Sequence, residues 1–257
     1  MRRYVFHGEM PWCLLSCLVV VVLAATAAIA DPIPYGSLVA QNIIFEDVEE
    51  EPATGNSPLF DTPTVGQNSL VFFPVSFSAA SIGGDPTTDE TSGTLSMTVA
   101  SIGGAPIVSI RIWEMGDYSL AGNGTSVTTV ARSTPIVVTI VEVNGGAVAL
   151  PPLLASVVFN PHPAGTLNLI DDGGQGVAWT GEAVVDIVGA LADQGIAGKA
   201  TKVTLSLENT LTASSEQASA ALIAKKQFGI DVMIPEPSSL GILLVACCLP
   251  LARRRRR

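Results

Sequence analysis

The sequence predicts a mainly β protein, folded as a single antiparallel β-sandwich with a jelly-roll-like arrangement. Between Asp31 and Met233, several short runs alternate between apolar and polar residues, which is the pattern of strands with one buried face. Glycine-rich turns separate these runs, as at Gly122-Asn123-Gly124 and Asn144-Gly145-Gly146. Many short strands joined by such turns are typical of sandwiches. We therefore expect residues 31–233 to form one domain.

The alternating and apolar runs predict six strands. Val203, Leu205 and Leu207 share one face of their run. Val108, Ile110 and Ile112 share the inner face of another. A run that is apolar on both faces, 134–143, is predicted to lie inside a sheet. Pro74 cannot donate to a strand ladder, so its strand is expected at an edge or a bulge. In order, we expect strands over 70–78, 94–100, 107–115, 134–143, 202–208 and 227–232.

Two segments are not predicted to be strands. The acidic stretch 45–58 is expected to be an exposed loop. In segment 183–194, apolar residues such as Val184, Ile187 and Leu191 follow helical spacing, and Gly195 stands where a helix would stop. The sequence therefore predicts one short helix at 183–194, packed across an end of a sheet.

The N-terminus has the three parts of a secretory signal peptide. Arg2 and Arg3 are positively charged, residues 13–25 form an uncharged, mostly apolar run, and Ala28 and Ala30 supply the small residues that signal peptidase recognises. We expect residues 1–30 to be removed during export. A retained N-terminal anchor is one alternative, and a lipoprotein acylated at Cys17 is another, although the most apolar stretch follows that cysteine.

Cysteine and charge content restrict the chemistry of the middle of the chain. All four cysteines lie near the termini, at Cys13, Cys17, Cys247 and Cys248, so the middle has neither disulfides nor thiols. Between residues 31 and 234 there are six basic and 21 acidic residues. So acidic a surface repels phosphate backbones, which argues against nucleic-acid binding.

The residue inventory offers little for catalysis, and we expect the protein not to be an enzyme. His162 is the one histidine after the predicted signal peptide, it lies between two prolines, and no GxSxG motif is present. A carboxylate pair of the kind used in glycoside hydrolysis is the alternative that remains open.

Two sets of residues are candidates for ligand binding. Trp113 follows Arg111 on the polar face of its predicted strand, with Tyr118 further along, and an aromatic side chain in that position could stack on a sugar. The alternative is that a second layer or a loop buries Trp113. We expect no cofactor, except that Asp171 and Asp172 beside a glycine turn could hold a structural calcium ion.

The C-terminus carries three features in a fixed order. Pro235, Glu236 and Pro237 come first, followed by the uncharged segment 240–252. As a helix those residues would span about 20 Å, which is short of the roughly 30 Å hydrocarbon core of a bilayer. A basic cluster ends the chain, comprising Arg253, Arg254, Arg255, Arg256 and Arg257, and the positive-inside rule keeps such a cluster cytoplasmic.

This arrangement closely resembles the PEP-CTERM sorting signal of exported bacterial proteins. The resemblance covers only residues 234–257 and says nothing about the middle domain. It implies that 240–252 is a short, transient transmembrane helix in the inner membrane. It also implies that an exosortase recognises Pro235, Glu236 and Pro237 and cleaves near them. The implied host is a bacterium with a Gram-negative type envelope that makes extracellular polysaccharide.

Together these features predict an exported, non-enzymatic protein of the cell surface or extracellular matrix, with a structural or adhesive role. Its partners during export would be signal peptidase and exosortase. Two alternatives remain open: a carbohydrate-binding module for extracellular polysaccharide, and a secreted hydrolase with a carboxylate pair.

Overall fold

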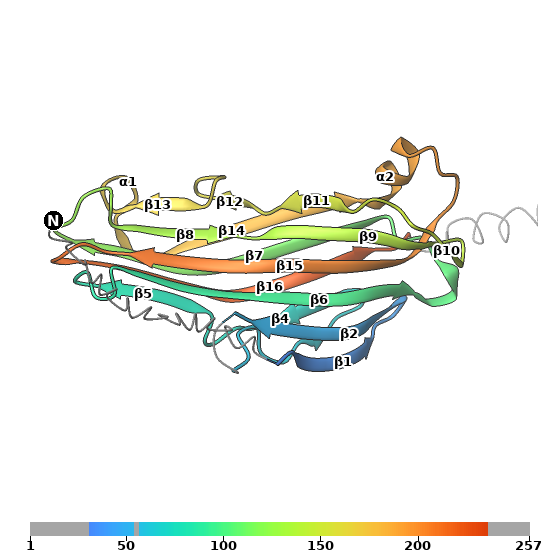
Figure 1. Cartoon of the computed structure of the whole chain (residues 1–257), viewed down its shortest axis with the longest axis horizontal. Helices are drawn as coiled ribbons and strands as arrows, with labels where there is room; N and C mark the ends of the chain where they lie inside the picture. Colours follow the sequence, from blue (N-terminus) through green and yellow to red (C-terminus); the bar gives the residue numbers. More distant parts are fainter. Residues whose placement is uncertain (1–30, 54–56, 236–257) are drawn as a thin grey trace, which may run out of the picture.

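The computed structural model describes residues 31–53 and 57–235, which form two antiparallel sheets stacked face to face (Figure 1). The predicted signal peptide with Ala28 and Ala30, the residues Glu236 and Pro237, and the segment 238–257 with its predicted membrane helix and arginine cluster lie outside the described residues. Within those described, no helix is both long and apolar enough to cross a membrane. The prediction of a mainly β sandwich is confirmed.

The larger sheet contains nine strands in the described part of the chain, six of them in the order β1-β2-β6-β15-β8-β13. Strand β9 shares one edge of β15 with β8 and carries β10 and β11 on its other edge. The strands are β1 (Ile33–Val39), β2 (Ile43–Pro52), β6 (Thr88–Ser101), β8 (Thr129–Ser133), β9 (Pro135–Val143), β10 (Gly146–Ala147), β11 (Leu153–Ser156), β13 (Thr166–Asn168) and β15 (Ala200–Ser214).

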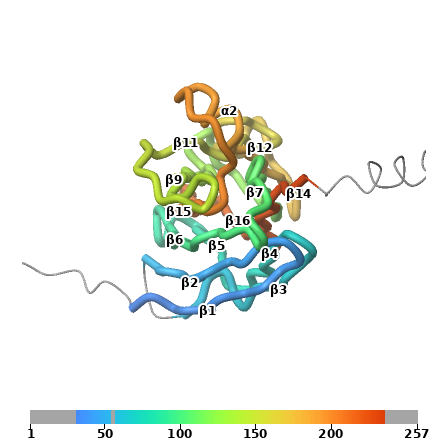
Figure 2. The backbone as a smooth tube through the Cα atoms, turned by 90° about the vertical axis from the view of Figure 1, so that its right-hand side faces the viewer, coloured from blue at the N-terminus to red at the C-terminus, as the bar shows by residue number. Residues whose placement is uncertain are grey.

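The smaller sheet contains seven strands among the described residues, six of them in the order β12-β14-β7-β16-β4-β3. Strand β5 pairs with the stretch of β16 that precedes the one paired with β4. The strands are β3 (Thr64–Val65), β4 (Ser69–Phe72), β5 (Ser78–Ile82), β7 (Ser109–Gly122), β12 (Val158–Asn160), β14 (Gly174–Asp186) and β16 (Ser219–Met233). Figure 2 shows the two layers from one end of the molecule.

The core lies between the sheets and follows the two-residue period of the strands. Val203, Leu205 and Leu207 of β15 are buried, as are Ile110 and Ile112 of β7. Because side chains alternate across a strand, the residues between them face solvent. The predicted strands at 94–100, 202–208 and 227–232 are confirmed within β6, β15 and β16. Those at 107–115 and 134–143 are confirmed as β7 and β9, except that β7 begins only at Ser109 and β9 at Pro135.

An aromatic cluster packs the core beneath β4 and β16. The ring centroid of Phe60 lies 5.8 Å from that of Phe72, 5.2 Å from that of Phe77 and 5.5 Å from that of Phe228, all at steep interplanar angles. Such edge-to-face contacts add to the free energy gained by burying the rings.

The prediction of an exposed loop over the acidic stretch 45–58 was wrong for its first half. Residues Ile43–Pro52 form strand β2, in which buried and exposed positions alternate. Glu50 faces inwards and is fully buried, and its carboxylate accepts hydrogen bonds from the backbone N–H groups of Leu59 and Phe60 and from the Tyr35 hydroxyl. A buried carboxylate is tolerated because these donors replace its water.

The predicted helix at 183–194 begins four residues too early. Residues 183–186 are the end of β14, where Val184 pairs with Arg111 of β7, and helix α2 (Ile187–Asp193) follows. The Asp186 carboxylate caps it by accepting from the Gly189 N–H at 2.9 Å. A second helical turn, α1 (Leu169–Asp172), was not predicted. The predicted stop is confirmed, since Gly195 has a positive φ of 68°.

The predicted strand at 70–78 was too long. Strand β4 ends at Phe72, and the chain has left the ladder before Pro74, which therefore lies at neither a sheet edge nor a bulge. The next strand, β5, begins only at Ser78.

Candidate functional site

Trp113 lies flat on the outer face of the smaller sheet. It pairs across the ladder with Gly229 of β16, and the space above that glycine is filled by the indole ring. A Cβ atom on Gly229 would lie 2.3 Å from Trp113 Cε2 and Cζ2. The indole Nε1–H donates to Asp231 Oδ2 at 3.0 Å, which fixes the ring in this orientation. The side chain is half-buried, with its inner surface on the sheet.

Charged side chains surround Trp113 on the same face. The Arg111 guanidinium bridges two carboxylates, with Nε 2.8 Å from Glu182 Oε1 and Nη1 3.2 Å from Asp231 Oδ2. A second bond joins Arg111 Nη2 to Glu182 Oε2 at 3.1 Å, making that contact bidentate. The hydrogen bond from Arg111 holds the pKa of Glu182 below its usual value. Exposed pairs like these add little stability but orient the side chains.

A shallow groove of about 380 Å³ runs beside Trp113 between β7, β14 and β12. Its floor and rim combine polar groups with exposed apolar ones, including Val158 at 59% exposure and Met115 at 39%. Val184, on the outer side of β14, is 58% exposed. Exposed apolar groups gathered on one face are typical of a binding surface. We call this surface, with Arg111, Trp113, Glu182, Gly229 and Asp231, the Trp113 face.

Tyr118 does not belong to the Trp113 face, so its prediction as a ligand contact was wrong. It lies an odd number of residues from Trp113 along β7 and therefore points into the core, where it is 3% exposed. Its hydroxyl donates to the backbone oxygen of Asp172 at 3.2 Å. The structure thus brings Arg111 and Trp113 together and separates Tyr118 from them.

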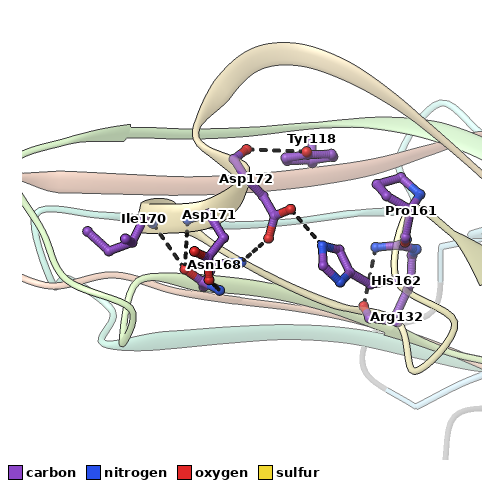
Figure 3. A network of polar contacts seen from close by, with 9 residues as sticks. Tyr118, Arg132, Pro161, His162, Asn168, Ile170, Asp171 and Asp172 are labelled. Carbon is purple, nitrogen blue, oxygen red and sulfur yellow. Dashed lines mark hydrogen bonds and ion pairs between the residues drawn. The ribbon is translucent and has the colours of Figure 1, made fainter.

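The predicted calcium ligands Asp171 and Asp172 already have protein partners (Figure 3). The carboxylate of Asp172 accepts from His162 Nε2 at 2.7 Å and from the Asn168 N–H at 3.0 Å. That of Asp171 accepts from Asn168 Nδ2 at 2.8 Å. In residues 31–53 and 57–235, no three His, Cys, Asp or Glu side chains gather as a metal site. The contacts of both aspartates thus order the loop around α1.

His162 also contacts the loop around α1, through the carboxylate of Asp172. Its ring nitrogen meets Asp172, while Arg132 donates to the backbone oxygens of Pro161 and, at 3.2 Å, of Gly165. Burial lowers the pKa of Arg132 to about 10, and its guanidinium stacks on the Phe159 ring at 4.8 Å from the centroid. The contacts of His162 are those of a residue that holds a loop.

Sequence reasoning missed three members of the Trp113 face: Glu182, Gly229 and Asp231. Glu182 and Asp231 lie on strands far from Arg111 in the sequence and reach it only because β14 and β16 flank β7. Gly229 offered one local signal, since a glycine inside a strand often marks a close approach by another group.

Comparisons with known proteins assign no family to this chain. No family model and no curated protein matches it. Among solved structures, TmCBM61 in complex with β-1,4-galactotriose has a TM-score of 0.22 and 9% identity, covering 79% of this chain and 90% of that one. A family 12 xyloglucanase from Bacillus licheniformis has a TM-score of 0.21 and 12% identity, covering 79% and 98%. The family 11 xylanase from Neocallimastix patriciarum has a TM-score of 0.19 and 8% identity, covering 79% and 100%. TM-scores this low assign neither a fold family nor an activity.

Proposed function

We propose that this chain is an exported adhesive protein that binds a polysaccharide through the Trp113 face. The observation that carries the proposal is the indole of Trp113, laid flat over Gly229 and tied to Asp231. A ring held in this way offers its outer surface to a ligand without first losing rotational freedom. The apolar CH surface of a sugar ring can pack on it, as apolar groups pack on other aromatic faces.

The polar groups around the indole suit the hydroxyl groups of a sugar. Carboxylate oxygens of Glu182 and Asp231 accept hydrogen bonds, and Arg111 donates them. Because Arg111 already faces two carboxylates, the Trp113 face has no spare positive charge for an acidic polymer. The proposed ligand is therefore a neutral polysaccharide.

Glycan binding tests this function. The protein is applied to an array of neutral and acidic glycans and to the extracellular polysaccharide of its host, next to Trp113→Ala. Val137→Ala is the matched control, because Val137 is 38% exposed on the outer face of the opposite sheet. We expect Val137→Ala to bind as the wild type does and Trp113→Ala to lose binding. Absence of binding by the wild type, or equal binding by Trp113→Ala, would contradict the proposal.

The proposed location rests on the two ends of the chain. We propose that signal peptidase removes residues 1–30 and that an exosortase cleaves near Pro235, Glu236 and Pro237 after transient insertion of 240–252, which releases the sandwich to the cell surface or matrix. Mass spectrometry of the mature protein from its host tests this. Recovery from the inner membrane with Arg253–Arg257 still attached would rule the sorting proposal out.

We also propose that the protein binds the polysaccharide without cleaving it. A glycoside hydrolase needs one carboxyl group with a raised pKa to act as a general acid. On the Trp113 face, Arg111 does the opposite and lowers the pKa of Glu182. Incubating the bound glycan with the protein and measuring released reducing ends tests this point, and release above the buffer control would favour the hydrolase alternative.

A further inference from the structure

Three polar side chains meet in the core between the two sheets. Glu114 comes from β7, Asn209 from β15 and Lys225 from β16, and each is at most 2% exposed. Glu114 and Lys225 belong to the smaller sheet, whereas Asn209 belongs to the larger one. This cluster lies on the inner side of the smaller sheet, so it takes no part in the Trp113 face.

The amine of Lys225 contacts both of the other groups. Its Nζ meets Glu114 Oε2 on one side and Asn209 Oδ1 on the other. The Thr134 hydroxyl lies 2.8 Å from Glu114 Oε1 and 3.2 Å from Asn209 Oδ1. The side-chain carbon Cγ of Asn209 is bonded directly to Oδ1, so the lysine amine, the amide carbon and a carboxylate are neighbours.

Aromatic rings shield this cluster from water. Lys225 Nζ lies 5.1 Å from the centroid of the Phe77 ring and 5.3 Å from that of Phe228. Burial among these groups lowers the pKa of Lys225, because desolvation disfavours the ammonium form. An uncharged lysine amine is a nucleophile.

One atom of the cluster has no role in a simple ion pair. Asn209 Nδ2 is buried and has no hydrogen-bond partner among residues 31–53 and 57–235. A buried amide N–H without a hydrogen-bond partner lowers the stability of the folded state, and native structures contain few such groups. The cost disappears if this nitrogen leaves the protein.

We propose that Lys225 and Asn209 join in an isopeptide bond, with Glu114 as the catalytic proton carrier, so that the fold covalently crosslinks its own two sheets. The proposal is independent of glycan binding, because it rests on different residues on the other side of the smaller sheet.

The reaction balances with the groups in place. The Lys225 ammonium passes a proton to Glu114, and the free amine attacks Cγ of Asn209, forming a C–N bond. Glu114 gives this proton to Nδ2 and then takes up the proton that the attacking nitrogen loses as it becomes an amide, so that one proton remains on Glu114 at the end. The bond from Cγ to Nδ2 then breaks, and ammonia leaves. No oxidant, reductant or other reactant is needed, because one amide is exchanged for another. Holding amine and amide in contact replaces a slow bimolecular step with an intramolecular one.

Digestion of the full-length protein gives a direct test. Trypsin and a glutamate-specific protease together release Asn209–Glu216 and Gln217–Lys225 as separate peptides from an uncrosslinked chain. With the bond in place, trypsin cannot cut after Lys225. Asn209–Glu216 then stays joined to Gln217–Lys226, at the summed mass of these two peptides less one ammonia.

The expected wild-type product is thus a joined pair whose mass equals that of Asn209–Glu216 plus that of Gln217–Lys226, minus one ammonia. Separate peptides of unmodified mass would overturn the proposal. So would an ammonia loss confined to Asn209–Glu216, because that would be cyclisation of Asn209 on its own backbone.

Variants test the roles of the three residues. Glu114→Gln and Lys225→Arg should each give separate peptides, and Asn209→Asp should give a joined pair that has lost water instead of ammonia. Lys226→Arg is the matched control, since Lys226 is exposed and pairs with Asp117 at 3.7 Å, and it should keep the crosslink. A joined pair in Glu114→Gln would remove Glu114 from the mechanism. The wild-type digest decides the crosslink itself, even where a variant fails to fold.

Discussion

Replacing Gly229 with alanine should displace Trp113 without removing it, which tests whether the flat indole is what binds. The new Cβ would lie 2.3 Å from Cε2 and Cζ2 and 2.6 Å from Nε1 of Trp113. Carbon atoms in contact prefer about 3.5 to 4.0 Å, so the ring must move outwards by about 1 Å or more. That movement lengthens the 3.0 Å hydrogen bond from Nε1 to Asp231.

Gly229→Ala should weaken binding more than it lowers the free energy of unfolding. Removing a tryptophan anchor costs about 2 kcal/mol or more, or about 30-fold in Kd. Gly229→Ala keeps the ring but tilts its surface, so we expect a smaller loss of about tenfold. The free energy of unfolding should fall by only about 1 kcal/mol, the lower end for overpacking, because the indole can swing into solvent.

Calorimetric titration with the bound glycan measures Kd, and near-ultraviolet circular dichroism reports the movement of the ring. Val137→Ala again serves as the control. If Gly229→Ala changed the dichroism but bound the glycan as tightly as the wild type, the flat orientation would not be what binds the sugar. An unchanged spectrum would show that the predicted displacement does not occur.

Three further predictions concern stability, each measured by urea denaturation. Phe60→Ala removes the centre of the aromatic cluster and should lower the free energy of unfolding by about 3 to 5 kcal/mol, and a loss under about 1 kcal/mol would contradict this packing. Glu50→Ala leaves the N–H groups of Leu59 and Phe60 without their acceptor and should cost about 3 kcal/mol, whereas a neutral effect would mean that Glu50 does not order this segment. Burial and the bond to Glu50 raise the pKa of Tyr35, so its contribution is complete below the unfolded pKa of about 10 and is lost as the pH rises above it. Tyr35→Phe should flatten that alkaline decline, and an identical pH profile would argue against it.

Local pattern was a good guide where it was long and strictly alternating. Val203, Leu205 and Leu207 were placed correctly because a two-residue period repeated over several residues fits a strand and not a helix. The pattern was a poor guide where it was short. The position of Val184 is compatible with the apolar pattern of a helix and with that of a strand. It lies in a strand because this part of the chain pairs with the edge of β7.

Charge misled the prediction at β2 for a related reason. Glu50 is polar by type, yet it lies inside because backbone N–H groups from a later segment replace its water. The N–H groups of Leu59 and Phe60 belong to a segment that follows β2, and the residues around Glu50 do not specify where that segment lies. The buried cluster of Glu114, Asn209 and Lys225 was missed in the same way, since charged residues are usually exposed.

The sequence by itself determined that this protein is mainly β: alternating runs separated by glycine turns indicate antiparallel strands, because only strands bury every second side chain. It also contains the export and sorting features, which lie outside the described residues except for Pro235 and stay predictions. The tertiary structure alone decided both sites. Trp113 meets Gly229, and Lys225 meets Asn209, because β16 pairs with β7 and packs against β15. Such pairing depends on the packing of whole strands, which no local pattern encodes.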